Sequence, residues 1–189
     1  STVFMLLQLA WRRGDLAQAD AVLARYDDGS APMLGLRANQ LLYRRDFAGA
    51  TALFDRAIAN ASDLQSDSDF NGYIEARIAW GLKQALAEDR LGHADKAKSL
   101  FDDAAQQARK ALATHPSNPN VRAAWHIVLA IALAGTGDAQ AAREQAVQAT
   151  REVPTSMDKL EGPAWVDYAL MVDGMNGDAA RAVAGLRSQ

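Results

Sequence analysis

A short turn recurs five times along this chain of 189 residues, and the same spacing of small and apolar residues surrounds it each time. The turns are Gly14-Asp15, Arg45-Asp46, Gly92-His93, Gly137-Asp138 and Gly177-Asp178. An alanine stands five residues after the first residue of every turn, at Ala19, Ala50, Ala97, Ala142 and Ala182. Two helices joined by a tight turn have this register, with a small residue where their backbones approach closely. Such repetition indicates a stacked helical array.

The register predicts an all-α fold in which about five helical hairpins form a curved solenoid. We expect a single domain over residues 1–189, since neighbouring hairpins in an array bury a continuous core. Alanine is abundant and favours helices, and the alternation of polar and apolar residues that is typical of strands is missing. The hairpins are predicted at about 2–27, 32–61, 70–114, 119–152 and 163–188. Within the third hairpin, the helices are expected at 70–91 and 94–114.

Composition excludes several classes of function. A formal net charge of −3 argues against a nucleic-acid partner, which would need a basic face. Without cysteine there is no disulfide and no thiolate metal site. The longest apolar run, residues 127–135, is shorter than the roughly 18 residues of a membrane span. The location stays open: the absence of cysteine suits the cytoplasm, and equally the periplasm if the chain is attached to a membrane-anchored regulator.

The repeat pattern resembles the tetratricopeptide (TPR) family. The fourth hairpin carries the resemblance most fully, with Ala130, Gly137, Ala142, Ala149 and Pro154 at the small, turn and proline positions of that family in the correct order. A narrower resemblance covers about residues 85–188 and includes the segment VPTSMDKLEGP. This region is similar to the C-terminal TPR regions of bacterial multidomain signalling proteins with a kinase, cyclase or winged-helix output domain. Because the chain starts without methionine and stops in mid-pattern, we expect a fragment of a longer protein.

The TPR resemblance also implies where a partner binds. In that family the first helix of each hairpin lines a concave groove, and the register then places five candidate residues on this face. They are Trp11, Arg12, Asn39, Tyr43 and Arg90. Aromatic residues and arginine are typical of binding hot spots. The alternative is that Trp11 and Tyr43 pack between hairpins while the arginines form a solvated rim.

One loop resembles the start of a calcium-binding loop. Asp67, Asp69 and Asn71 stand at positions one, three and five of the EF-hand pattern, and Gly72 follows at position six. The twelfth position, which normally supplies a bidentate glutamate, is Ile78. We therefore favour a polar loop in which Asp67 or Asp69 caps the next helix, with calcium binding as the weaker alternative.

No catalytic motif is present. The chain has no GxSxG, HExxH, P-loop or GxGxxG spacing, and its three histidines lie outside any metal-binding pattern. We therefore expect no enzymatic activity and no cofactor. The predicted function is a protein-interaction or scaffolding module that binds a protein or peptide in its groove. The alternative is a small-ligand-sensing domain that regulates an attached output domain, and an enclosed cavity would favour it over an open groove.

Overall fold

The computed structural model describes residues 2–62 and 72–188, and these residues form ten helices without any strand. This confirms the predicted all-α fold. The chain divides into two compact units, residues 1–97 and residues 98–189, and each is described here by itself.

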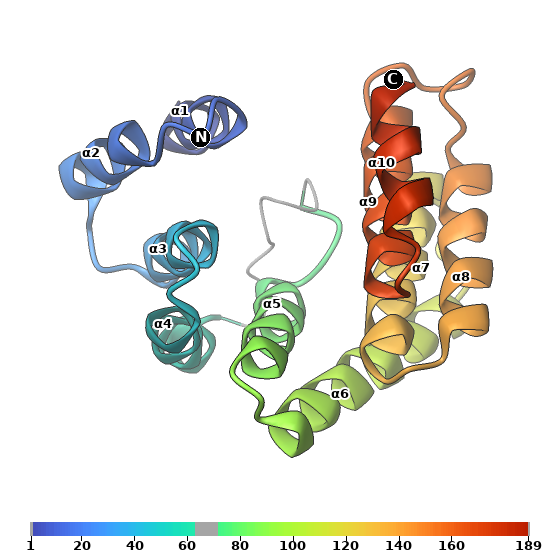
Figure 1. Cartoon of the computed structure of the whole chain (residues 1–189), viewed down its shortest axis with the longest axis horizontal. Coiled ribbons are helices and arrows are strands. Elements are labelled where there is room, and N and C mark those ends of the chain that lie inside the picture. Colours follow the sequence, from blue (N-terminus) through green and yellow to red (C-terminus); the bar gives the residue numbers. More distant parts are fainter. Residues whose placement is uncertain (1, 63–71, 189) are drawn as a thin grey trace. The chain divides into compact units, whose positions relative to one another are not determined.

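The first unit contains the helices α1 to α5 and the start of α6 (Figure 1). The bounds are α1 (Thr2–Arg12), α2 (Leu16–Tyr26), α3 (Ala31–Tyr43), α4 (Phe47–Asn60), α5 (Ala76–Arg90) and α6 (Ala94–Ala113). From α1 to α5, each helix packs against the one that follows it: α1 on α2, α2 on α3, α3 on α4 and α4 on α5. Leu7 and Phe54, both fully buried, belong to the two apolar clusters of this unit.

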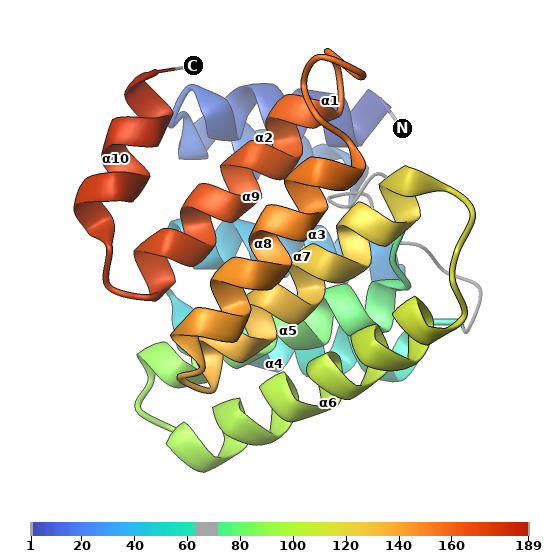
Figure 2. The ribbon, with the colours of Figure 1, turned by 90° about the vertical axis from the view of Figure 1, so that its right-hand side faces the viewer.

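The second unit contains the rest of α6 and four further helices. These are α7 (Pro119–Gly135), α8 (Ala139–Glu152), α9 (Gly162–Met175) and α10 (Ala179–Arg187). The helices α7, α8 and α9 contact one another and lie side by side (Figure 2), and α10 packs against α9.

The first helix of the third hairpin is shorter than the sequence predicts. It begins at Ala76, not at residue 70. Gly72 has a left-handed backbone with φ of 80°, and Glu75, directly before the helix, is extended. Neither conformation continues an α-helix, so the first helical hydrogen bonds are those that the carbonyl of Glu75 accepts.

All five predicted turns have one backbone geometry. The first residue of each has a positive φ, between 60° at Arg45 and 91° at Gly137. The N–H of the second residue donates to the carbonyl five residues earlier, at 2.9–3.0 Å, in the pattern that closes a helix with a left-handed residue. In four turns the second residue is an aspartate whose carboxylate caps the next helix, at Asp15, Asp46, Asp138 and Asp178. Each turn therefore ends one helix and starts the next.

Small residues allow the helices to approach closely. Ala19, Ala50 and Ala142 are completely buried, and Ala97 is buried as well. Gly35 on α3 lies against the ring of Trp80 on α5, and a Cβ at Gly35 would stand 2.6 Å from that ring. The contact between α3 and α5 therefore requires glycine at this position.

Two glycine substitutions should have opposite effects on stability. Gly35→Ala is expected to lower the free energy of unfolding by about 1–2 kcal/mol, since the clash with Trp80 outweighs a gain of about 1 kcal/mol in helix propensity. Gly81→Ala on α5 should raise it by about 0.5–1 kcal/mol, because a Cβ there meets no atom within 4 Å. Urea denaturation measures both changes. If both substitutions changed the free energy of unfolding equally, the close approach of Trp80 to Gly35 would be contradicted.

Candidate functional site

The first helices of the three hairpins in the first unit touch one another in order. The rings of Trp11 on α1 and Tyr43 on α3 are 5.1 Å apart between centroids and tilted by 36°. The backbone of Gly35 on α3 meets Trp80 on α5. These two contacts link α1 to α3 and α3 to α5, three helices that are each the first of a hairpin.

Three of the predicted site residues occupy the same position on these three helices. Arg12, Tyr43 and Arg90 each stand two residues before the first residue of their turn, and each is exposed. Tyr43 retains 56% of its accessible surface. We call this register-equivalent set of an arginine, a tyrosine and an arginine the 12/43/90 row.

The other two predicted residues lie beneath the surface. Trp11 is 8% exposed, and its indole Nε1 donates to the side-chain oxygen of Gln40 at 2.7 Å. Gln40 in turn donates to the carbonyl of Leu16 and to Asp20. Asn39 is 6% exposed. The buried ring of Trp11 therefore packs against the exposed ring of Tyr43, and Tyr43 is the one of the two that a partner can reach.

A buried carboxylate stands two residues before Arg90. Only 3% of the Glu88 side chain is exposed, and Lys96 Nζ lies 2.7 Å from its Oε1. His93 Nδ1 lies 2.6 Å from its Oε2, so the residue at the position of the capping aspartate of the other turns contacts Glu88 here. Burial alone raises the pKa of Glu88, but the hydrogen bonds from Lys96 and His93 outweigh it and hold the pKa below its ordinary value. The same contact raises the pKa of Lys96.

The fifth hairpin carries an equivalent pair in the second unit. Asp173 is buried, and Arg181 Nε lies 3.1 Å from its Oδ2. Glu88 and Asp173 both stand four residues before their turn glycine, while Lys96 and Arg181 stand four residues after it. The pattern was not among the predicted site residues, although an alignment of the five turns displays it.

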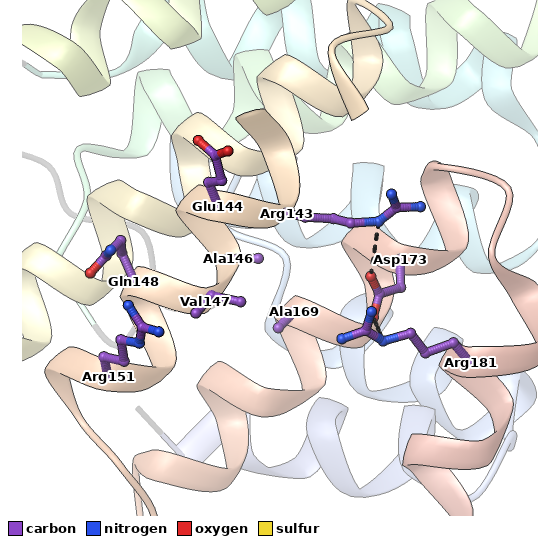
Figure 3. A pocket seen from close by; sticks show the side chains of 9 residues that line it. All are labelled: Arg143, Glu144, Ala146, Val147, Gln148, Arg151, Ala169, Asp173 and Arg181. Atoms are coloured by element: carbon purple, nitrogen blue, oxygen red, sulfur yellow. Dashed lines mark ion pairs between the residues drawn. The ribbon is translucent and has the colours of Figure 1, made fainter. Parts of the chain in front are cut away.

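A pocket of about 320 Å³ lies beside this second pair (Figure 3). Arg143, Arg151 and Arg181 line it together with Asp173 and short apolar side chains of α8 and α9. These arginines were not among the site residues predicted from the sequence. Arg143 and Arg151 are eight residues apart on α8, with Ala146 and Val147 between them on the same face, and that spacing is the signal that could have found them.

The calcium-loop candidates Asp67, Asp69 and Asn71 lie outside the described residues. Within residues 2–62 and 72–188, no group of three or more histidine, aspartate or glutamate side chains is placed to hold a metal ion. No helix in that part of the chain is both long and apolar enough to cross a bilayer.

In comparisons with known proteins, no protein-family model and no curated protein matches the chain.

Proposed function

We propose that this chain is a non-enzymatic interaction module that binds an acidic peptide segment along the 12/43/90 row. The observation that carries the proposal is the exposure of Arg12, Tyr43 and Arg90 at one position on three first helices that touch in order. The proposal includes the TPR-like array of five hairpins in a curved solenoid. The uniform turns and the packing of successive helices within each unit support it.

The chemistry of the row favours an extended acidic partner. Guanidinium groups at Arg12 and Arg90 suit carboxylates, which they can contact through two parallel hydrogen bonds. Tyr43 stands between them, is packed on the buried Trp11, and offers a large contact area at low entropic cost. We place this module in a larger bacterial signalling protein, in line with the resemblance of residues 85–188.

Tyr43 and Arg12 should affect binding through different rates. Peptides are first selected from a random displayed library on the immobilised chain, and we expect them to be rich in aspartate and glutamate. Tyr43→Ala should weaken their binding about thirtyfold, the equivalent of about 2 kcal/mol, chiefly through faster dissociation. Arg12→Glu should slow association at low salt, since a rim charge acts mainly on the encounter. Biolayer interferometry measures both rates.

The matched control is Arg56→Glu, the same charge change at an exposed residue of α4, which is the second helix of its hairpin. It should leave both rates within about twofold of the wild type, as a charge far from the contact acts weakly at moderate salt. Wild-type rates for both Tyr43→Ala and Arg12→Glu would place the peptide site elsewhere.

A further inference from the structure

We propose that the pocket between α8, α9 and α10 binds a small organic anion, with its acidic group on the terminal guanidinium nitrogens of Arg143 and Arg181 and its apolar body over Ala146, Val147 and Ala169. The proposal uses the second unit alone and is independent of the peptide site in the first. It gives the ligand-sensing alternative a definite location and a ligand class.

The pocket has a charged end and an apolar centre. Arg143 and Arg181 approach Asp173 from opposite sides at one end, and Arg151 lies at the other end beside Gln148 (Figure 3). Between the two ends the lining consists of Ala146, Val147 and Ala169. Arg143, Val147 and Arg151 recur at a spacing of four on α8, so these three side chains come from one face of that helix.

The arginines at the charged end retain hydrogen-bonding capacity. Arg181 contacts Asp173 through Nε at 3.1 Å, and the nearest approach of Arg143 is also through Nε, at 3.8 Å. The Arg143 Nε is buried and has no hydrogen-bond partner among the described residues. Since a guanidinium carries five N–H donors, the terminal nitrogens of both side chains remain available for an oxyanion.

The carboxylates that line the pocket leave it suited to an anion. Asp173 already lies between two guanidinium groups. Glu144 points away from the centre of the pocket and accepts a hydrogen bond from Gln140, one turn earlier on α8 (Figure 3). The lining therefore contains three arginines and two carboxylates, and both carboxylates already have partners.

The size and floor of the pocket favour a small organic molecule over a bare ion. A volume of about 320 Å³ is at the lower end of the range for small-molecule sites, roughly 300–1,000 Å³. Ala146 is buried and Val147 is 40% exposed, so a short apolar chain can cover surface that is now in contact with water. A phosphate or carboxylate head with an alkyl body fits both parts of the lining.

The test compares three probes on the full chain by calorimetric titration: hexyl phosphate, inorganic phosphate and hexanol. Hexyl phosphate should bind with a dissociation constant of about 1 mM or tighter. Inorganic phosphate should bind at least about tenfold more weakly, because it buries no methylene groups. Hexanol, which lacks the charge, should give no saturable binding. In a ¹⁵N spectrum, hexyl phosphate should shift the amide signals of Ala146 and Ala169.

Two variants separate the charged end from the apolar centre. Arg143→Gln should weaken hexyl phosphate about tenfold, since a hydrogen bond from a charged group is lost while Asp173 keeps Arg181. Ala169→Leu fills the centre and should reduce the affinity for hexyl phosphate to that for inorganic phosphate. The control Arg187→Gln, an exposed arginine of α10 outside the lining, should change the affinity less than about twofold.

The proposal is overturned if hexyl phosphate shows no saturable binding up to about 10 mM, a limit far above the expected constant. Equal weakening by Arg143→Gln and Arg187→Gln would also overturn it, because general surface charge would then explain the binding. The helical circular dichroism signal of each variant shows whether it is folded. If Ala169→Leu does not fold, the affinity of Arg143→Gln for hexyl phosphate, compared with that of Arg187→Gln, decides the test.

Discussion

Replacing Lys96 with methionine is expected to lower the free energy of unfolding by about 3 kcal/mol. The change leaves the Glu88 carboxylate, of which only 3% is exposed, with His93 as its remaining close partner. Removing one member of a buried ion pair typically costs 3–5 kcal/mol. We expect the lower end of that range because the Lys96 side chain is 50% exposed and water screens the pair. Urea denaturation at pH 7 measures the loss.

A double substitution tests the cause of that loss. Leu133 and Ala141 hold the corresponding positions of the fourth hairpin, so Glu88→Leu with Lys96→Ala copies an arrangement that the chain already contains. The double variant should recover at least about half of the stability that Lys96→Met loses, since a buried ion pair is often no better than an apolar pair. If the double variant is as unstable as the single one, the uncompensated charge is not the reason for the loss.

The effect of Lys96→Met should also depend on pH in a definite direction. The folded-state pKa of Glu88 is lowered, so its contribution to stability is present above the unfolded-state pKa, near the ordinary value of 4.5. That contribution disappears as the pH falls through the folded-state pKa. The difference between the wild type and Lys96→Met should therefore be largest near neutral pH and shrink below about pH 4.5.

Ala50→Leu is expected to destabilise the first unit by about 3 kcal/mol, and Ala142→Leu should do the same in the second unit. Both alanines are 0% exposed and follow their turn by five residues, where the two helices of a hairpin cross. Added methylenes in a packed core force neighbouring side chains and backbone to shift, which typically costs 1–3 kcal/mol. We expect the upper end because leucine adds three carbon atoms at a site without free surface.

The matched control is Ala52→Leu, on the same helix α4 but exposed. It should change the free energy of unfolding by less than about 0.5 kcal/mol, as surface substitutions usually do. Chemical denaturation compares the three variants with the wild type. An unchanged midpoint for Ala50→Leu and Ala142→Leu would mean that these positions do not lie between packed helices.

The turns and small residues of this fold could be predicted from the sequence because they depend on local chemistry. A positive φ favours glycine, and an aspartate after it caps the next helix, so Gly14-Asp15 and Gly137-Asp138 identify their own positions. At Arg45 the same backbone occurs without glycine, and the repeat register located it. Ala182 follows the register as well, but α10 has no buried residue, so there the small residue is only half-buried.

The candidate site could be predicted only in part, since burial depends on neighbours that are distant in sequence. Arg12, Tyr43 and Arg90 are exposed as a groove residue should be. Trp11 is covered because Gln40 and Tyr43 meet it from another helix, and no local pattern encodes that contact. The pocket of the second unit depends in the same way on side chains from three helices.

The uniform turn also has a consequence for how the chain reaches its fold. The hydrogen bond that closes each turn joins residues only five apart in sequence, from Asp15 to Ala10 in the first hairpin and from Asp178 to Asp173 in the last. Forming such a contact costs little loop-closure entropy, and chains rich in local contacts fold quickly. For the proposed array of hairpins we therefore expect folding to start at any of the five turns, without an obligatory order.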